Sequence, residues 1–343
     1  MKNRTLGIAA LILVCVFIAL ASPSHHPPAQ PRDVAELKVT IHEWAVPTKG
    51  AHPHDPAVGP DGALWFTEQM ANKLGRLDPK TGEFKEYPLV EGKNSGPHGL
   101  VADSEGNIWY TANFAGYIGK LDPRTGKVTE YKMPSEKADD PHSLVFDAQG
   151  ILWFTAQGGN MVGRLDPKSG KIELREVPTE SALPYGIQIN SKGVPIFCEL
   201  GTNKMGSIDP KNLKITEYPL PESARPRRLA IAADDTVYFT DFKSGHLGVL
   251  NTASGAVKMY ASPGGAESNP YGIAITPDGM VWYSESGVKP NTIVRFDPKT
   301  ETFARANIPS GGGVVRNMAA TRDGRLYIAC SGVDKVGVVE TAK

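Results

Sequence analysis

A two-residue turn signal recurs seven times along the chain, at intervals of 42 to 45 residues. Dipeptides of this kind close short β-hairpins, and the interval is that of β-propeller blades. The seven signals are Asp61-Gly62, Glu105-Gly106, Gln149-Gly150, Lys192-Gly193, Asp234-Asp235, Asp278-Gly279 and Asp323-Gly324. The sequence therefore predicts seven copies of one β-rich unit.

Each turn signal lies between two runs of strand-forming residues. A small apolar run such as Leu100-Val101-Ala102 precedes it, and an aromatic-rich run such as Leu64-Trp65-Phe66-Thr67 follows it. A third run ends in a turn such as Asp78-Pro79-Lys80-Thr81-Gly82, in which Asp, Pro and Gly suit the turn geometry. A fourth run comes next. The pattern predicts four antiparallel strands per unit, with the strand-two tryptophans packed between blades.

The two ends of the repeat complement each other. The seventh unit has no fourth strand after Val336–Glu340, whereas Val39–Trp44 has the fourth-strand pattern and no unit before it. We predict an all-β, seven-bladed propeller in which the N-terminal strand completes the last blade. Closing the ring in this way removes exposed sheet edges.

The N-terminus has the pattern of a signal peptide. An uncharged apolar run follows Lys2 and Arg4, and Ala19-Leu20-Ala21 fits a cleavage site. We expect a signal peptide over residues 1–21, a flexible linker over 22–35 and the propeller over 36–343. The protein is then expected to be periplasmic or secreted, with no membrane span after cleavage.

The charge of the chain is balanced, with 37 basic and 37 acidic residues. The chain has no excess of basic residues with which to bind the phosphates of a nucleic acid, so we expect no nucleic-acid partner. The sequence lacks the common nucleotide, zinc-protease, haem and serine-hydrolase motifs. We expect a monomer with a small-molecule or anionic ligand.

Two sets of residues occupy equivalent positions near the axis. The strand-one set lies eight residues before the turn glycine or its equivalent and comprises His54, His98, His142, Tyr185, Arg227, Tyr271 and Arg316. The strand-two set lies six residues after it and comprises Glu68, Ala112, Ala156, Glu199, Asp241, Glu285 and Cys330. Because the start of strand one pairs with the end of strand two, both sets are expected to face one axial funnel.

The composition of these sets suggests two chemistries. Carboxylate oxygens or histidine nitrogens could hold a divalent cation. The arc of Arg227, Tyr271 and Arg316 could instead bind a carboxylate or another anionic or planar ligand. A third interpretation is structural, in which these polar groups pair with one another and with water.

Several motifs resemble those of the virginiamycin B lyase (streptogramin lyase) family. They are Pro97-His98-Gly99-Leu100, Trp65-Phe66-Thr67-Glu68, Leu74-Gly75-Arg76-Leu77-Asp78-Pro79, and Ile273-Ala274-Ile275 with Asp278-Gly279. The resemblance covers about residues 36–343. It implies a seven-bladed propeller that opens a cyclic depsipeptide antibiotic by magnesium-dependent elimination, in which a base removes a proton next to the ester carbonyl.

The resemblance also assigns roles to particular positions. The family's metal-binding Glu at the end of strand two in blade six corresponds to Glu285, and its Glu-x-His pair corresponds to Asn269 and Tyr271. The implied assignments are therefore Tyr271 as the proton-transfer residue, with Glu285 and Asn269 at Mg²⁺ or another divalent cation. A substrate-contacting His of the family is replaced by Arg227, which we group with His54, His98, His142, Tyr185 and Arg316 as substrate-binding candidates.

Three functions remain open at this point. The first is a metal-dependent lyase that acts on an ester, lactone or sugar-acid substrate. The second is a non-catalytic propeller that binds a ligand or a protein. The third is a metal-dependent hydrolase similar to the gluconolactonases.

Overall fold

The computed structural model describes residues 34–341. The expected signal peptide, residues 1–21, lies outside the described residues. The expected linker lies outside them except for its last two residues, which belong to β1 (Val34–Glu36).

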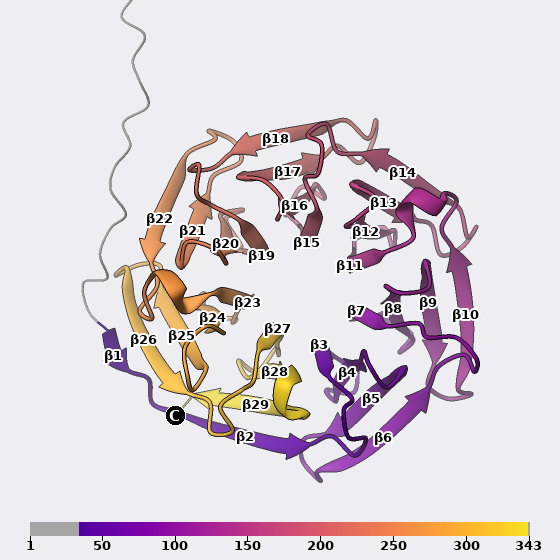
Figure 1. Ribbon diagram of the computed structural model, residues 1–343, viewed down its shortest axis with the longest axis horizontal. Helices are drawn as coiled ribbons and strands as arrows, with labels where there is room; N and C mark the ends of the chain where they lie inside the picture. Colours follow the sequence, from indigo (N-terminus) through magenta and orange to yellow (C-terminus); the bar gives the residue numbers. More distant parts are fainter. Residues whose placement is uncertain (1–33, 342–343) are drawn as a thin grey trace, which may run out of the picture.

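Seven blades, each with four antiparallel strands, surround one axis, and strand one of each blade is innermost (Figure 1). The predicted all-β, seven-bladed propeller is confirmed. Blades one to three contain β3 (Pro53–Val58), β4 (Leu64–Glu68), β5 (Lys73–Asp78), β6 (Glu83–Pro88), β7 (Pro97–Ala102), β8 (Ile108–Ala112), β9 (Tyr117–Asp122), β10 (Lys127–Lys132), β11 (Pro141–Phe146), β12 (Leu152–Ala156), β13 (Met161–Leu165) and β14 (Ile172–Glu176). Blades four to six contain β15 (Pro184–Ile189), β16 (Pro195–Glu199), β17 (Lys204–Ile208), β18 (Ile215–Pro219), β19 (Pro226–Ile231), β20 (Val237–Asp241), β21 (His246–Leu250), β22 (Val257–Ala261), β23 (Pro270–Ile275), β24 (Val281–Glu285), β25 (Thr292–Asp297) and β26 (Thr302–Asn307).

The seventh blade joins the two ends of the chain. It is built from β27 (Val315–Ala320), β28 (Leu326–Cys330), β29 (Lys335–Thr341) and, as its outer strand, β2 (Val39–Ala45). β2 pairs antiparallel with β29, from Val39 opposite Thr341 to Ala45 opposite Lys335. The predicted closure of the ring by the N-terminal strand is therefore confirmed.

One pairing was not predicted. β1 adds to the outer edge of blade six, parallel to β26, with Val34 opposite Phe303 and Glu36 opposite Arg305. It covers part of an edge that would otherwise leave backbone groups unpaired. Three short 3₁₀ helices also occur among the described residues: η1 (Glu136–Ala138), η2 (Ala266–Ser268) and η3 (Ser331–Val333).

The core is divided among the blade interfaces. Each of seven clusters of buried apolar side chains combines residues from adjacent blades. The strand-two tryptophans Trp65, Trp109, Trp153 and Trp282 lie in these clusters and are 1–3% exposed, as expected for inter-blade packing. Strand three also packs closely against the aromatic side chains of strand two. In blade one, a Cβ on Gly75 would lie only 2.1 Å from the Phe66 ring, so this position requires glycine.

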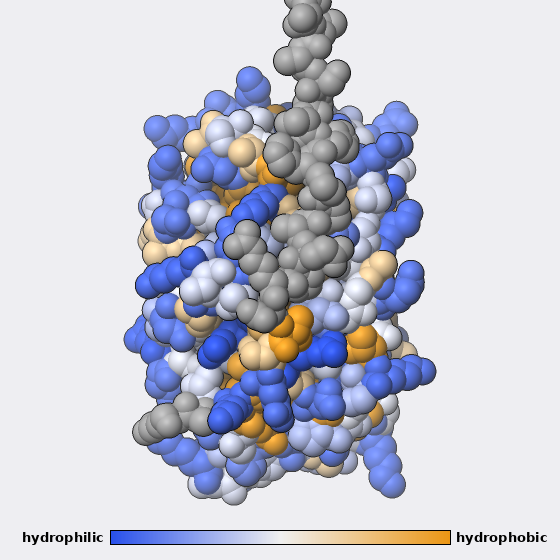
Figure 2. All heavy atoms as spheres, turned by 90° about the vertical axis from the view of Figure 1, so that its left-hand side faces the viewer, coloured by the Kyte–Doolittle hydropathy of each residue, from blue (hydrophilic) through white to orange (hydrophobic). Residues whose placement is uncertain are grey.

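On the side of β22 and β26, hydrophilic residues dominate the outer wall, and hydrophobic ones form small separate areas (Figure 2). The described residues include no helix with the length and apolar character needed to cross a membrane.

A β-bulge shapes the inner end of every blade. In blade one the register between β3 and β4 shifts between Pro53 and Pro56, and all seven strand-one to strand-two pairs have the same shift. A bulge bends the strand and redirects its side chains. The two residues inside each bulge, such as His54 and Asp55, are those that occupy the axis.

A hydroxyl at the fourth position of strand two joins neighbouring blades. Thr111 Oγ1 accepts a hydrogen bond from the Gly99 N–H at 2.7 Å and donates one to the carbonyl of His142, in the next blade, at 2.8 Å. Equivalent bridges are made by Thr67, Thr155, Thr240 and Ser284. Each bridge ties one bulge to the next blade and thereby fixes the residues at the axis.

Replacing Thr111 tests this bridge. Thr111→Val keeps the shape of the side chain but leaves the Gly99 N–H and the His142 carbonyl without that partner. The free energy of unfolding should fall by about 2 kcal/mol, because an unpaired buried polar group costs about 1–3 kcal/mol. Urea denaturation measures the change. Thr111→Ser, which keeps the hydroxyl, is the matched control and should lose less stability; an equal or larger loss in Thr111→Ser would contradict the bridge.

Candidate functional site

Seven side chains meet around the axis at one end of the propeller. This hub ring consists of the first residue of each bulge: His54, His98, His142, Tyr185, Arg227, Tyr271 and Arg316. The ring centroids of His54 and His98, of His98 and His142, and of His142 and Tyr185 are each 3.8 Å apart. The Tyr185 and Tyr271 hydroxyls are 2.5 Å apart. The structure thus brings together all the proposed substrate-binding residues and Tyr271.

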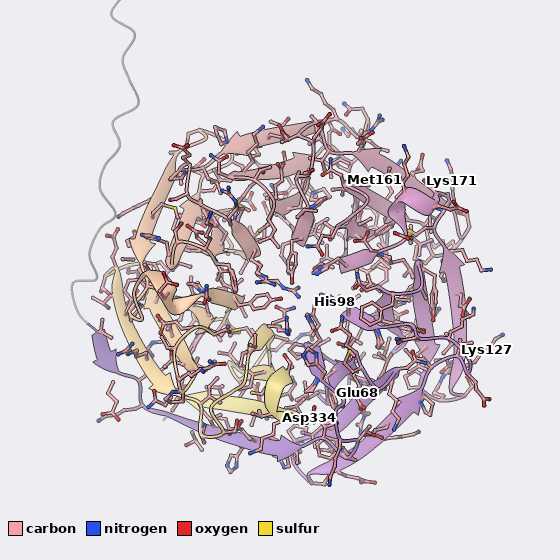
Figure 3. All side chains as sticks on the ribbon, in the orientation of Figure 1. Glu68, His98, Lys127, Met161, Lys171 and Asp334 are labelled. Carbon is pink, nitrogen blue, oxygen red and sulfur yellow. The ribbon has the colours of Figure 1, made fainter. Side chains whose placement is uncertain are left out.

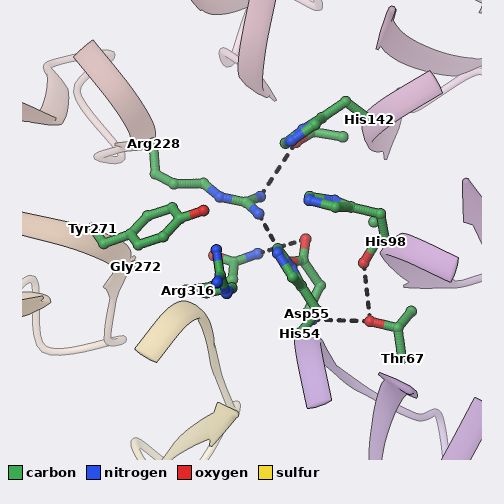
Figure 4. Close-up of polar contacts among 12 residues, drawn as sticks. His54, Asp55, Thr67, His98, His142, Arg228, Tyr271, Gly272 and Arg316 are labelled. Atoms are coloured by element: carbon green, nitrogen blue, oxygen red, sulfur yellow. Dashed lines mark hydrogen bonds and ion pairs between the residues drawn. The ribbon is translucent and has the colours of Figure 1, made fainter. Parts of the chain in front are cut away.

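A second layer lies directly beneath the hub ring and was missed by the sequence analysis. Arg228 reaches across the axis, so that its Nη2 lies 2.7 Å from Asp55 Oδ1 and its Nη1 donates to Ser143 Oγ at 3.2 Å (Figure 4). Asn317 Nδ2 donates to Asp55 Oδ2 at 3.1 Å. The layer therefore links blades one, three, five and seven.

The sequence does contain a signal for this layer. The residues directly after the hub-ring positions are Asp55, Gly99, Ser143, Gly186, Arg228, Gly272 and Asn317, and only Asp55 and Arg228 among them are charged. The glycines allow the next blade to approach, since a Cβ on Gly99 would lie 2.5 Å from the His142 carbonyl oxygen. A single Arg and a single Asp in an otherwise small, uncharged layer predict a pair across the axis.

The three hub-ring histidines are almost fully buried. Burial lowers the pKa of His54 well below its usual range, and the nearby Arg316 and Arg228 guanidiniums lower it further. Burial is also the main cause that lowers the pKa of His98 and of His142. These side chains are therefore neutral imidazoles near neutral pH, and each keeps one N–H donor and one acceptor nitrogen.

The accessible part of the hub is the pair of arginines on either side of Tyr271. Arg227 and Arg316 are half-buried, and their guanidinium carbons lie 3.9 Å and 6.0 Å from the centre of the Tyr271 ring. Arg316 Nε also donates to Ser331 Oγ at 3.0 Å. Within the part of the chain that the structure describes, no carboxylate lies within 4.0 Å of either guanidinium. Both charges are thus held in place without an acidic partner.

The carboxylates of the strand-two set do not join the hub ring. Glu68 lies farther from the axis than His98 (Figure 3), and Asp241 accepts a hydrogen bond from the Arg225 N–H. Glu199 accepts one from Thr202 Oγ1 at 3.1 Å. The two sets were expected to face one funnel, but the bulge directs only the strand-one set to the axis.

Glu285, the metal-ligand candidate, is surrounded by hydrogen-bond donors. Its carboxylate accepts from Ser262 Oγ at 2.6 Å, from the Gly264 N–H at 2.5 Å and from Thr292 Oγ1 at 2.6 Å. Asn269 Nδ2 donates to the Phe242 carbonyl at 2.9 Å. The carboxylate already accepts from three donors, and the Arg305 guanidinium lies 3.9 Å from it. This environment does not suit a divalent cation, and the residues present in blade six therefore do not fit Mg²⁺.

A different trio has ligand atoms close enough for a metal. One ligand atom from each of His54, Asp55 and His98 lies within 4.8 Å of the others. However, Asp55 is already paired with Arg228 at 2.7 Å, and Arg316 lies near enough to lower the pKa of both histidines. This positive field opposes the binding of a cation.

The chain has recognisable relatives. It matches the model of the virginiamycin B lyase family over residues 33–286 and 196–343. A solved streptogramin B lyase is 26% identical with a TM-score of 0.81, over 89% of this chain and 98% of that one. A virginiamycin B lyase from Staphylococcus aureus is 25% identical with a TM-score of 0.79, over 89% and 100% of the two chains. The hydrazine synthase of Kuenenia stuttgartiensis, 17% identical with a TM-score of 0.71 over 87% and 97%, shares the fold.

Glu68, outside the hub ring, gives the stability of the protein a testable pH dependence. Both of its carboxylate oxygens are buried and lack a hydrogen-bond partner among the described residues, and burial raises its pKa from 4.5 to about 8. The folded state thus binds the proton more tightly than the unfolded state, so the free energy of unfolding falls as pH rises from about 4.5 to about 8. Glu68→Gln should remove the contribution of Glu68 to this fall in the free energy of unfolding.

Chemical denaturation between pH 5 and pH 8.5 measures the effect. Between pH 5 and pH 8.5, the free energy of unfolding of Glu68→Gln should rise by about 2 kcal/mol relative to that of the wild type. The full pKa shift of Glu68 would imply a larger difference, but water that reaches the charged carboxylate reduces it. Glu83→Gln, at an exposed position of the same blade, is the control. Parallel stability curves for Glu68→Gln and the wild type would contradict a buried protonated Glu68.

Proposed function

The chain belongs to the virginiamycin B lyase family, and we propose that it uses the hub ring of that propeller to bind a small dicarboxylate. The ligand would extend from Arg227 to Arg316, with one carboxylate on each guanidinium. The observation that carries this proposal is the pair of half-buried guanidiniums without a carboxylate partner among the described residues.

The charges around the axis support an anion. Arg227, Arg228 and Arg316 contribute three positive charges, and Asp55 offsets one of them through Arg228. A guanidinium binds a carboxylate through two parallel hydrogen bonds, which fixes orientation as well as adding energy. Two guanidiniums that hold position against aromatic rings lose little side-chain entropy when the ligand binds.

The buried rings supply the floor of the site. Arg227 also lies 4.2 Å from the centre of the Phe242 ring, so it is held between Phe242 and Tyr271. Because the histidines are neutral, they do not repel the guanidiniums as charged histidines would. The floor therefore positions the guanidiniums and leaves their outer edges to the ligand.

We also propose that the protein acts outside the cytoplasm. The basic start, the apolar run and the Ala19-Leu20-Ala21 sequence support export and cleavage near residue 21. The ligand would then be met in the periplasm or outside the cell.

A second candidate function is the elimination reaction that the family resemblance implies, with Tyr271 as the base. The Arg227 guanidinium lies over the Tyr271 ring, and the Tyr271 hydroxyl lies 2.5 Å from that of Tyr185. As the base, Tyr271 would take a proton from the carbon next to the one that bears the ester oxygen. A double bond would form between these two carbons, and the carbon–oxygen bond would break so that the carboxylate leaves. Tyr271 is only 1% exposed, so a substrate would have to displace its neighbours, and this favours the binding function.

Calorimetric titration with succinate tests the binding proposal. Succinate should bind, and Arg316→Gln should weaken it about tenfold or more, because one bidentate contact is lost. Raising the salt concentration should weaken binding as well. The neutral analogue succinamide should bind much more weakly.

The matched control is Arg322→Gln, which removes an exposed arginine from the strand-one to strand-two turn of blade seven. It should leave succinate affinity unchanged. The proposal is overturned if succinamide binds as well as succinate, or if the Arg316 and Arg322 variants behave alike.

Incubation with a streptogramin B antibiotic and Mg²⁺ separates the two candidates. We expect no linearised product by mass spectrometry, because blade six lacks a carboxylate free for the cation. Linearisation that is lost in Tyr271→Phe would establish the second candidate in place of the first.

A further inference from the structure

A cavity of about 450 Å³ extends along the axis on the other side of the second layer. Strand one of every blade contributes to its wall, and Asp55, Ser143, Arg228 and Asn317 form its inner end. None of the hub-ring residues lines it. The cavity is therefore separate from the dicarboxylate site, and its volume lies in the range of small-molecule sites.

Peptide groups, rather than side chains, face this cavity along most of its wall. Strand one pairs only with strand two, so among the described residues no strand covers its axial edge. Its side chains point to the neighbouring blades instead: Leu100 packs between blades one and two, and Val101 packs between blades two and three. The unpaired N–H and C=O groups of such an edge make the surface of the cavity mostly polar.

The inner end of the cavity has more donors than acceptors. A guanidinium carries five N–H groups, and Arg228 directs one toward Asp55 and one toward Ser143. Its Nε has no hydrogen-bond partner among the described residues. The Asp55 oxygens already pair with His54, Arg228 and Asn317. The group that this end lacks is an additional acceptor, and an anionic acceptor forms the stronger hydrogen bond with a guanidinium.

We propose that the axial cavity binds a short polyhydroxylated carboxylate, with its carboxylate toward Arg228 and its hydroxyl groups along the peptide edges of the wall. A hydroxyl both donates and accepts, so it can pair with either kind of peptide group. An alkyl chain would instead displace the water that hydrates these groups and leave them unpaired. The proposal does not depend on the dicarboxylate site, since the two lie on opposite sides of the second layer.

Calorimetric titration with gluconate tests the proposal against two matched probes. Hexanoate has the carboxylate and the chain length of gluconate but no hydroxyl groups. Sorbitol has the hydroxyl groups and the chain length but an alcohol in place of the carboxylate. Gluconate should bind, and each of the other two should bind about tenfold more weakly or worse, because each lacks one of the two kinds of contact.

Charge variants of Gln188 test whether the ligand lies in the cavity. Gln188 is an exposed residue of the wall, so substitutions there should leave the fold intact, which circular dichroism checks. Gln188→Glu should weaken gluconate binding and Gln188→Lys should strengthen it, each by about threefold or more at low salt, because the added charge repels or attracts the carboxylate. Gln188→Ala, the uncharged control, should change the affinity for gluconate less than either of them.

Three outcomes would overturn the proposal. In the first, gluconate does not bind the wild-type protein, which would indicate that the cavity holds water only. In the second, hexanoate or sorbitol binds as tightly as gluconate. In the third, the charge variants of Gln188 bind gluconate alike or Arg316→Gln loses it, either of which would place the ligand outside the cavity. Succinate affinity should be the same in Gln188→Glu as in the wild type, so failure of this proposal is distinguishable from failure of the dicarboxylate site.

Discussion

The antiparallel pairing of β2 with β29 is the contact on which the rest of the molecule depends. It takes the outer strand of blade seven from the other end of the chain, and without it β29 would present an unpaired edge. Closure also fixes how many first strands surround the axis. The hub ring combines residues as distant as His54 and Arg316, and these come together only because the ring is complete.

Most of the fold could be predicted because it follows from spacing. The repeat gives the strands, their order and the closing strand, and the equivalent positions locate the hub ring. Spacing does not reveal a bulge, however. The extra residue between Pro53 and Pro56 turns both His54 and Asp55 toward the axis, while Glu68 remains in its blade. The expectation that the strand-two carboxylates face the funnel assumed a regular hairpin, which the chain does not form. β1 was missed because three residues are too few to show a period.

The second layer shows why composition at equivalent positions matters more than any single motif. Gly99, Gly186 and Gly272 let the next blade approach, since a Cβ on any of them would lie 2.5–3.0 Å from its backbone. Arg228 is buried at the axis and needs a counter-charge, because an isolated buried ion is strongly unfavourable. Asp55 provides it from across the axis. The small residues, the cation and the anion thus form one arrangement that closes the axis beneath the hub ring.

The surplus of positive charge at the axis opposes the catalytic cation that the family's scaffold would suggest. A catalytic cation would have to bind beside Arg227, Arg228 and Arg316, where only Asp55 opposes them, and the carboxylate that could receive it in blade six is already bonded to three donors. An anion bound at the hub ring would instead offset the surplus positive charge. The same electrostatic reasoning therefore favours an acidic ligand there, where Arg227 and Arg316 have no carboxylate partner among the described residues.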